Sequence, residues 1–433
     1  MNLSPFHLII LAVCGLSIFL GLLVFSGTIP GFRDTPGGTL GTVIMWGPVP
    51  EETMEPLVND FNKANSDQFT LAYEYHPSTS FEAELLEALA TGQNPDLIIF
   101  SSDIFYRQGS KLLPIPYSAL PERDFKDTFV EAGEIYLTPV GSLALPLLVD
   151  PLMMYYNRSL LSGAEISVPP ATWSLFRPAV EKINLVDNNK VITRTAAAMG
   201  EFSNNRQAKN ILSLLLLQAG TPISRLTERG YTSALADTTG GTILPGQAAL
   251  DYFAQFADPG KTSYSWNRSL PEARDSFAAG ILATYLAPAS DLSAVRAKNP
   301  NLNFDITSVP QRDNSRRLTV AKVYGVGILR QAPNLQAAAV AALALASQDP
   351  QKALAQITGL PPARRDLLAE GASDAYQDAF YRSAIMAVSW VDPDPVATER
   401  IFGTATERVT TGQATAFDSI NRAGQELKAI FGN

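Results

Sequence analysis

The 433-residue sequence contains few residues of the types that carry covalent or metal chemistry: one cysteine, Cys14, and two histidines, His7 and His76. A single cysteine can form neither a disulfide within the chain nor a thiolate zinc site. A metal site would therefore depend on carboxylates, and no aspartate-rich calcium loop occurs. The Gly-x-Ser-x-Gly nucleophile motif and the phosphate-binding Gly-x4-Gly-Lys motif are also absent. We therefore predict no cofactor and no metal.

Charged residues are also sparse, at 17% of the chain, while apolar residues make up 46%. This composition is typical of a globular protein and excludes a mainly disordered chain. The formal net charge is −9, and the basic residues are scattered rather than gathered in a stripe, which argues against a nucleic-acid partner. The chain is too long for one compact core, so we expect two domains and an accessory segment.

The segment before the first charged residue, Arg33, is almost entirely apolar. Residues 8–25 form an 18-residue apolar stretch, which as a helix would span about 27 Å, close to the thickness of a bilayer's hydrocarbon core. We predict a transmembrane anchor over residues 1–30, in contact with the membrane through residues 6–29, and a linker over residues 31–39. A cleaved signal peptide is the alternative, but its apolar region is normally ~7–15 residues long and follows Lys or Arg.

Residues 42–103 predict alternating strands and helices. Apolar runs at 42–46, 69–75 and 96–100 have the composition or alternation of strands. Two intervening helices are predicted by apolar residues at helical spacing, namely Met54, Leu57, Val58 and Phe61 in the first and Leu85, Leu86 and Leu89 in the second. This alternation builds a parallel sheet, and parallel sheets bind ligands beyond the carboxyl ends of their strands. Polar and aromatic residues stand at those ends, so we expect half of a binding cleft here.

The remaining sequence predicts a second α/β unit with a helical end. Apolar runs at 143–149 and 153–156 flank Asp150-Pro151, where we predict a bend that marks a change of sheet or lobe, because proline removes a backbone donor. Further strands are predicted at 281–286, 304–309 and 321–329, and helices at 173–183, 206–218, 246–257, 271–279, 337–346, 375–388, 396–409 and 414–431. This order suggests two α/β lobes that exchange chain segments.

Several segments of the chain resemble, in the same order, the segments of one known protein family. They are GTVIMWGPVPEETMEPLVNDFNKAN (41–65), ELLEALATGQNPDLIIFSSD (84–103), LPLLVDPLMMYYNRSLL (145–161) with PPATW (169–173), FAAGILATYLAP (277–288), YGVGILRQAPN (324–334) and ERVTTGQATAFDSINRAGQEL (407–427). Together they resemble the extracellular solute-binding proteins of the maltose-binding type (family 1), the capture components of ABC importers. Each segment alone is weak, but the ordered set covers nearly everything from residue 41 onward.

The resemblance implies a two-lobe, type II periplasmic-binding-protein-like α/β fold behind the transmembrane helix. The first lobe would hold residues 40–146 plus 326–370, and the second lobe residues 147–325 plus 371–433. The implied function is capture of a carbohydrate (an oligosaccharide) by hinge closure and its delivery to ABC permease subunits. The resemblance also implies a monomer that is not an enzyme, anchored in the cell membrane with its lobes on the extracytoplasmic side.

The candidate ligand-binding residues are aromatic and acidic, because a sugar stacks its C–H-rich face on aromatic planes and bonds its hydroxyls to carboxylates. Residue type and position in the predicted strands and helices suggest Trp46, Glu51, Ser101, Tyr285, Tyr324 and Trp390. The resemblance implies Phe100, Asp103, Asp150 and Tyr156. Structural alternatives exist for all of them, since aromatics fill cores, Glu51 would favour a helix dipole and Asp103 could cap a helix. Ser290 falls where maltose binders carry a stacking tryptophan, which argues against maltodextrin itself.

Two other functions remain open from the sequence. A glycoside hydrolase could use Asp103 and Asp150 as its carboxylate pair, provided that the two groups lie ~5–9.5 Å apart. The same fold could also serve as a sensor subunit or could bind a solute that is not a sugar.

Overall fold

The computed structural model describes residues 39–189, 191–237, 244–372 and 374–432. The transmembrane anchor predicted over residues 1–30 lies outside these ranges. Within the described ranges, no helix combines the length and the apolar character needed to cross a membrane.

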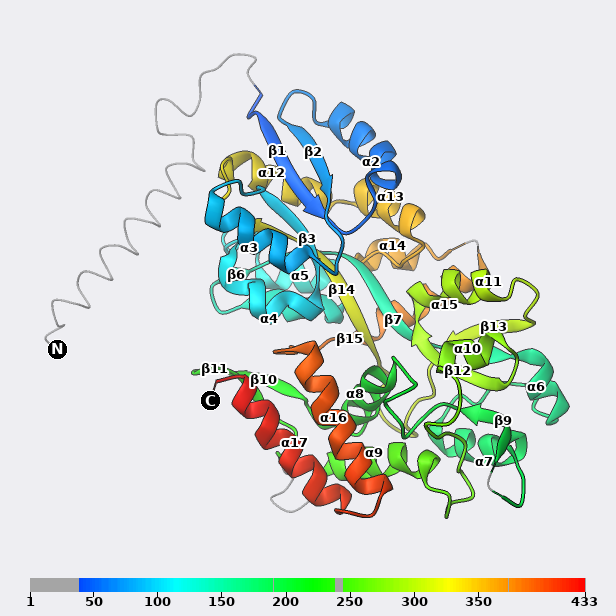
Figure 1. The fold of residues 1–433 in the computed structure, drawn as a ribbon. Coiled ribbons are helices and arrows are strands. Elements are labelled where there is room, and N and C mark those ends of the chain that lie inside the picture. Colours follow the sequence, from blue (N-terminus) through cyan, green and yellow to red (C-terminus); the bar gives the residue numbers. More distant parts are fainter. Residues whose placement is uncertain (1–38, 190, 238–243, 373, 433) are drawn as a thin grey trace, which may run out of the picture.

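Two long strands, β7 (Leu145–Asn157) and β14 (Thr319–Leu329), run through the middle of the molecule and join its two lobes (Figure 1). β14 pairs antiparallel with β3 (Leu97–Ser101) on one side and with the first half of β7 on the other. The second half of β7 pairs with β12 (Leu282–Pro288) and β13 (Phe304–Ser308). Both strands therefore belong to both lobes, and they form the crossovers.

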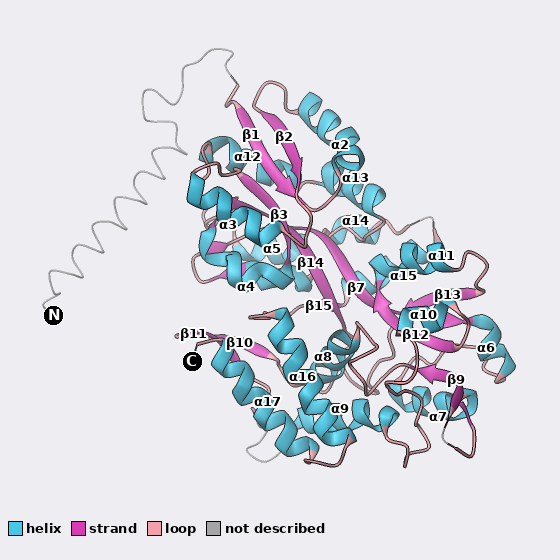
Figure 2. Ribbon diagram, in the orientation of Figure 1, coloured by secondary structure: helices cyan, strands magenta, loops and turns pink. Residues whose placement is uncertain are grey.

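The first lobe has a sheet in the order β2-β1-β3-β14 with helices on its faces (Figure 2). β1 pairs parallel with β2 and with β3. Besides β3, the elements of this lobe are β1 (Thr42–Gly47), α2 (Glu51–Ala64), β2 (Thr70–Tyr75), α3 (Phe81–Thr91), the 3-10 turn η1 (Ser102–Ile104), α4 (Phe105–Gln108), the 3-10 turn η2 (Gly109–Lys111), β4 (Leu112–Leu113), α5 (Glu122–Thr128), the 3-10 helix η3 (Glu131–Tyr136), the hairpin β5 (Leu137–Thr138) and β6 (Gly141–Ser142), α12 (Leu335–Leu345), α13 (Gln348–Thr358) and α14 (Arg365–Ala369).

The second lobe continues the strand order as β7-β12-β9-β8 and is richer in helices (Figure 1). Its elements are α6 (Arg158–Gly163), α7 (Trp173–Ile183), β8 (Leu185–Val186), β9 (Ile192–Ala197), α8 (Ala208–Gln218), the hairpin β10 (Ser224–Thr227) and β11 (Gly230–Ser233), α9 (Pro245–Ala254), α10 (Ala273–Ala278), η5 (Ala289–Asp291), α11 (Leu292–Lys298), α15 (Ala375–Ile385), α16 (Pro395–Thr410) and α17 (Ala416–Ile430). Short β15 (Ala387–Val388) pairs with β14 and leads back to this lobe.

Periodicity predicted the longer helices of both lobes, but it missed α13, and the helix predicted over 375–388 ends at Ile385, before strand β15. In α2 the residues that face the core include Met54, Leu57 and Phe61, all buried. Burying a large apolar side chain contributes about 1.5–3 kcal/mol, so the stripe fixes the face that the helix turns to the sheet. α3 ends at Gly92, whose φ of 74° is the left-handed cap that its Thr-Gly ending predicted.

The bend predicted at Asp150-Pro151 is absent, but the change of sheet or lobe predicted there is confirmed by the pairing, since β7 pairs with β14 up to Pro151 and with β12 from Leu152 onward. β7 is continuous through both residues, and all but one of its thirteen residues are buried. Pro151 stands opposite Ala321 of β14 within this pairing. Proline lacks a backbone donor, but a crossover strand tolerates one missing donor when its neighbours remain paired on both sides.

Candidate functional site

A cavity of about 400 Å³ lies between the lobes, against the two crossover strands. Its lining includes residues of the first lobe, of both crossover strands and of the second lobe, namely Ser102, Asp103, Asp150, Leu152, Arg206, Gln207, Lys209, Asn210, Pro288, Ser290, Asp291, Val320, Ala321, Lys322, Tyr324, Ser389, Trp390, Asp392 and Glu399. Four of the ten residues predicted from the sequence are among them: Asp103, Asp150, Tyr324 and Trp390. These four come from separate segments, and the fold brings them together.

Asp103 stands in the turn η1, directly after the buried strand β3. Its Oδ2 atom lies 2.7 Å from the Nζ atom of Lys322 on β14. The side chains of both residues remain about two-fifths exposed, which leaves the carboxylate accessible from the cavity. The first lobe therefore contributes a carboxylate that is held in place by a cation of the crossover strand.

Asp150 lies on the other crossover strand and is only 4% exposed. Its Oδ1 atom accepts a hydrogen bond of 3.0 Å from the backbone N–H of Ser290, in η5 of the second lobe. Burial raises the pKa of Asp150 above its usual value, while the hydrogen bonds from Ser290 and the charge of Lys322 oppose this rise. Asp150 thus links the crossover strand to the second lobe at the edge of the cavity.

Lys322 and Tyr324 project from β14 on the same face, because alternate residues of a strand share a face. Burial opposes the charge of Lys322, but the nearby carboxylates of Asp103 and Asp150 outweigh it and raise the pKa of the lysine. Burial raises the pKa of Tyr324 to about 12, so its hydroxyl stays protonated at neutral pH. This part of the cavity therefore offers a cation, two acids and a neutral hydroxyl.

The second-lobe wall combines amides, charges and one indole ring. The start of α8 contributes Gln207, Lys209 and Asn210. The Nζ atom of Lys209 lies 2.9 Å from the Oδ2 atom of the buried Asp392. Trp390 is half-buried and stacks on Phe402 of α16, with ring centroids 6.3 Å apart.

Trp46 and Glu51 lie at the carboxyl edge of β1 but do not line this cavity. Trp46 is 7% exposed, its Nε1 atom donates a 2.7 Å hydrogen bond to Glu74, and its ring stacks on His76 with centroids 3.6 Å apart. Both polar and aromatic surfaces of Trp46 thus have partners within the first lobe. Glu51 is exposed at the start of α2, where it accepts a long hydrogen bond from the backbone N–H of Tyr75.

The other predicted residues also lie away from the cavity lining. Phe100 is 2% exposed and packs edge-on against Tyr136 in the first lobe. Ser101 ends β3 opposite Tyr324 of β14. Tyr285, also 2% exposed, donates a 2.6 Å hydrogen bond to Asp291, and Tyr156 lies near the far end of β7 opposite Asp305. The structure therefore places Phe100 and Tyr285 in cores.

Sequence reasoning missed the basic and amide side chains of the cavity. Lys322, Arg206 and Lys209 line it, but no motif marks them in the sequence. Lys322 could have been found from its place: it lies two residues before Tyr324 on the same strand and opposite Asp150 in the pairing of the crossover strands. That pairing becomes known only with the fold.

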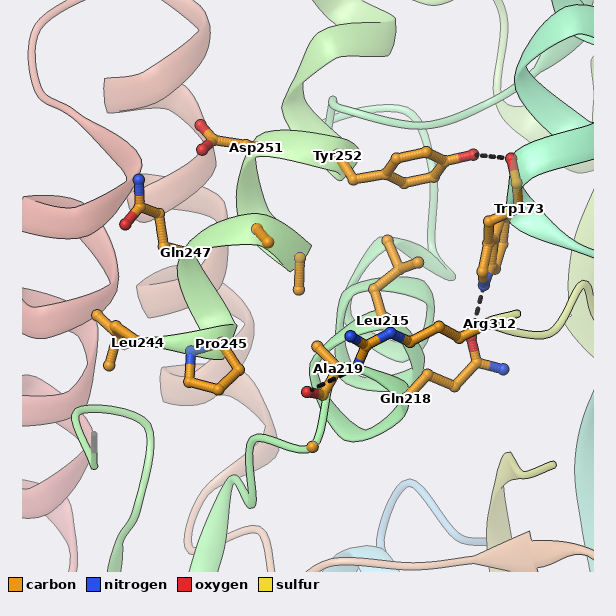
Figure 3. A pocket seen from close by; sticks show the side chains of 13 residues that line it. Trp173, Leu215, Gln218, Ala219, Leu244, Pro245, Gln247, Asp251, Tyr252 and Arg312 are labelled. Carbon is orange, nitrogen blue, oxygen red and sulfur yellow. Dashed lines mark hydrogen bonds between the residues drawn. The ribbon is translucent and has the colours of Figure 1, made fainter. Parts of the chain in front are cut away.

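A second, larger cavity of about 890 Å³ lies entirely within the second lobe, between α8 and α9 (Figure 3). Its polar side chains bond largely to neighbouring protein atoms. Trp173 donates to Gln218 at 2.5 Å, the hydroxyl of Tyr252 donates to the carbonyl of Trp173 at 3.1 Å, and Arg312 donates to the carbonyl of Ala219 at 3.2 Å. Neither crossover strand contributes to it.

No group of three or more His, Cys, Asp or Glu side chains in the described part of the chain is arranged to hold a metal ion.

Comparison with known proteins gives the same architecture. The sequence profile of the bacterial extracellular solute-binding proteins matches residues 56–381. A binding protein of Brucella abortus (strain 2308) is 24% identical over 277 residues, an alignment that covers 61% of this chain and 60% of that relative. The match thus spans less than two thirds of the relative's length.

Two solved structures are similar over nearly their whole length. The cyclic α-maltosyl-1,6-maltose binding protein from Arthrobacter globiformis has a TM-score of 0.73 at 16% identity, covering 90% of this chain and 98% of that one. The sugar-binding protein MalE from Xanthomonas citri has a TM-score of 0.72 at 20% identity, covering 90% and 97%. At these identities the likeness shows the fold, which is the predicted two-lobe, periplasmic-binding-protein-like α/β fold.

Proposed function

Because the chain belongs to the bacterial extracellular solute-binding proteins, we propose that it captures a carbohydrate, most simply a neutral oligosaccharide, between its lobes. The family predicted from the sequence is confirmed, and it implies an extracytoplasmic location. Carbohydrate as the ligand, delivery to ABC permease subunits, a monomeric state and a membrane anchor at the N-terminus are our proposals. The lobe boundaries at 146/147, 325/326 and 370/371 are part of the same proposal.

The observation that carries the proposal is the composition of the interlobe cavity. Carboxylates, amides and a tyrosine hydroxyl surround it, and the half-buried indole of Trp390 lies among them. Carboxylate and amide groups suit the many hydroxyls of a sugar, and an aromatic plane suits its C–H face. We propose Asp103, Asp150, Tyr324 and Trp390 as ligand contacts. The solved relatives are named as sugar-binding proteins, which supports this ligand class.

The position of the cavity supports a hinge mechanism. Its lining comes from both lobes and from both crossover strands, so a ligand there would contact groups that move relative to one another if the strands bend. A ligand shifts an equilibrium only if it binds one state better than the other. A sugar that contacts both lobes at once satisfies that condition in the closed form, and closure would present the loaded protein to the permease.

An enzymatic role is not favoured. Both the family and the solved relatives are binding proteins. The two candidate carboxylates also have structural partners, since Asp103 pairs with Lys322 and Asp150 accepts from the Ser290 backbone. A sensor subunit would use the same capture step, and reconstitution with permease and with candidate signalling proteins would separate the two outputs.

The test is a ligand screen combined with a distance measurement. The full chain, purified in a mild detergent, would be screened against neutral and acidic oligosaccharides by calorimetry. Because Cys14 is the only cysteine, a Cys14→Ser background allows spin labels at introduced cysteines. Glu87 on α3 and Lys428 on α17 are exposed and lie in different lobes. We expect their distance to shorten on binding, while a control pair within the first lobe, at Glu87 and Asp349, keeps its distance. Absence of any carbohydrate ligand, or binding without a change between the lobes, would reject the proposal.

A further inference from the structure

Lys322 occupies the point where the lobes and the crossover strands meet. On one side its ammonium group lies 2.7 Å from the carboxylate of Asp103, in the first lobe. On the other side it stands directly opposite Asp150 in the antiparallel pairing of β14 with β7. Directly opposed residues of antiparallel strands have side chains on the same face and in contact range. Asp150 in turn accepts from the backbone of Ser290, in the second lobe. Lys322 thus pairs with Asp103 and lies across the strand pair from Asp150, close enough for its charge to act on that carboxyl.

A nearby cation favours the ionised form of these two carboxyl groups. Asp150 is 4% exposed, and burial alone favours its neutral form. The nearby carboxylate of Asp291 raises the pKa of Asp150 as well. A protonated carboxyl keeps less acceptor capacity and forms weaker hydrogen bonds to hydroxyl donors than a carboxylate does. A cation between the two acids offsets both effects.

Three titratable groups lie around Lys322, and each comes from a different element. They are Asp103 from η1, Asp150 from β7 and Tyr324 from β14 itself. Two of the three other acids of the cavity wall, Asp392 and Asp291, have partners of their own: Asp392 pairs with Lys209 at 2.9 Å, and Asp291 accepts from Tyr285 at 2.6 Å. Among the described residues that line the cavity, Lys322 is therefore the cation that serves Asp103 and Asp150.

We infer that Lys322 is the positioning residue of the cleft, which holds the carboxylates of Asp103 and Asp150 in place as ionised acceptors for ligand hydroxyls. This inference rests on the proposed function for its ligand and deepens it. The net effect of the trio is one excess negative charge at the base of the cleft, so it suits neutral sugars with many hydroxyl donors. A sugar carboxylate would be repelled by the unbalanced acid.

The test compares Lys322→Met with Lys322→Arg in the full chain. Lys352→Met is a matched control, because Lys352 also pairs with a carboxylate, Glu370 at 3.1 Å, but on the exposed surface of the first lobe. With a neutral oligosaccharide that the unmodified chain binds, we expect Lys322→Met to weaken binding about tenfold or more at pH 7. The loss should grow as the pH falls, while Lys322→Arg restores most of the affinity and Lys352→Met changes nothing.

A second measurement needs no ligand. Carbon-13 NMR of labelled aspartate side chains, with the Asp150 signal assigned from an Asp150→Asn variant, follows the titration of that group directly. We expect Asp150 to titrate at a higher pH in Lys322→Met than in the unmodified chain, and Lys322→Arg to reverse the shift. A purely structural lysine would lower the melting temperature but leave this titration unchanged, and that result overturns the inference. If the unmodified chain binds no carbohydrate, the proposed function fails, yet the NMR titration still decides the role of Lys322.

Discussion

The two cavities differ in volume, but they differ more in the lobes and strands that line them. The cavity inside the second lobe is about 890 Å³, and the interlobe cavity is about 400 Å³. The larger one has walls from α8, α9 and neighbouring loops of one lobe, and its polar groups mostly bond to nearby protein atoms (Figure 3). The smaller one has walls from two lobes and two crossover strands, and carries charged groups on every side.

For ligand-driven closure, it is therefore more important which lobes contribute residues to a cavity than how large the cavity is. A molecule in the larger cavity would contact one lobe, so it would have no differential affinity for open and closed arrangements and could not drive a hinge. A molecule in the interlobe cavity would contact both. Matched substitutions in the walls of the two cavities should therefore affect ligand binding by the full chain differently.

Among substitutions that remove a side chain, the largest difference is expected from removal of one carboxylate in each cavity. Asp103→Ala deletes an acceptor for ligand hydroxyls and leaves Lys322 without its 2.7 Å partner. A hydrogen bond to a charged group is worth about 1.5–3 kcal/mol, so we expect affinity for the sugar to fall about 10- to 150-fold in calorimetry. Asp251→Ala, in the wall of the larger cavity, should keep affinity within about twofold. Equal losses in both variants would remove the distinction between the cavities.

A smaller effect is expected at the indole of the interlobe cavity. Trp390 is half-buried and stacks on Phe402, so its ring has a fixed orientation at the cavity wall. An aromatic contact of this kind contributes about 0.5–1.5 kcal/mol beyond burial, so Trp390→Ala should weaken binding about 2- to 13-fold. Trp390→Phe keeps a ring and should retain most of the affinity. Full affinity in Trp390→Ala would exclude the indole from the site.

Asp150 predicts an effect on stability and its pH dependence. Burial raises its pKa in the folded state, so the folded chain holds this proton to higher pH than the unfolded chain does. The ionised group therefore costs stability above its folded pKa, and acidification through that pKa removes the cost. Asp150→Asn keeps an oxygen that accepts from Ser290 without the charge. We expect a higher melting temperature than the unmodified chain at pH 7 to 8.

The advantage of Asp150→Asn should shrink as the pH falls, because the aspartate of the unmodified chain then becomes neutral as well. Calorimetric melting curves between pH 4 and 8 measure it. Asp349→Asn, at an exposed position of α13, is the control and should show no such trend. A variant that is less stable at every pH would contradict the burial argument and indicate that the contact with Lys322 outweighs it.

Local pattern in the sequence predicted most of the elements but only part of the site. The stripe of Met54, Leu57 and Phe61 and the left-handed cap at Gly92 depend on neighbours within one or two turns, and the structure has both. The bend predicted at Asp150-Pro151 failed because the strand is held by β14 and β12, which are far away in sequence. Tertiary pairing there overrides a local preference.

Local sequence pattern is also insufficient to predict the residues of the site. Asp103 could be placed from the end of its strand, but Trp46 and Phe100 have the same local signature and lie elsewhere. An aromatic residue at a strand end can turn to a core, to a local partner or to a cleft, and only the packing decides. Lys322 carries no local signal, since its importance comes from Asp103 and Asp150, more than 170 residues away in sequence.

The smallest effect should come from filling the larger cavity. Ala248 is exposed on α9 and lines that cavity, so Ala248→Trp would occupy part of the 890 Å³ without disturbing the core. We expect the free energy of unfolding to change by less than about 0.5 kcal/mol, and ligand affinity to stay within about twofold. The same indole introduced at Ser389, in the wall of the interlobe cavity, should abolish binding by steric exclusion. Calorimetric titration of both variants gives the comparison, and a tenfold loss in Ala248→Trp would mean that the larger cavity takes part in ligand binding after all.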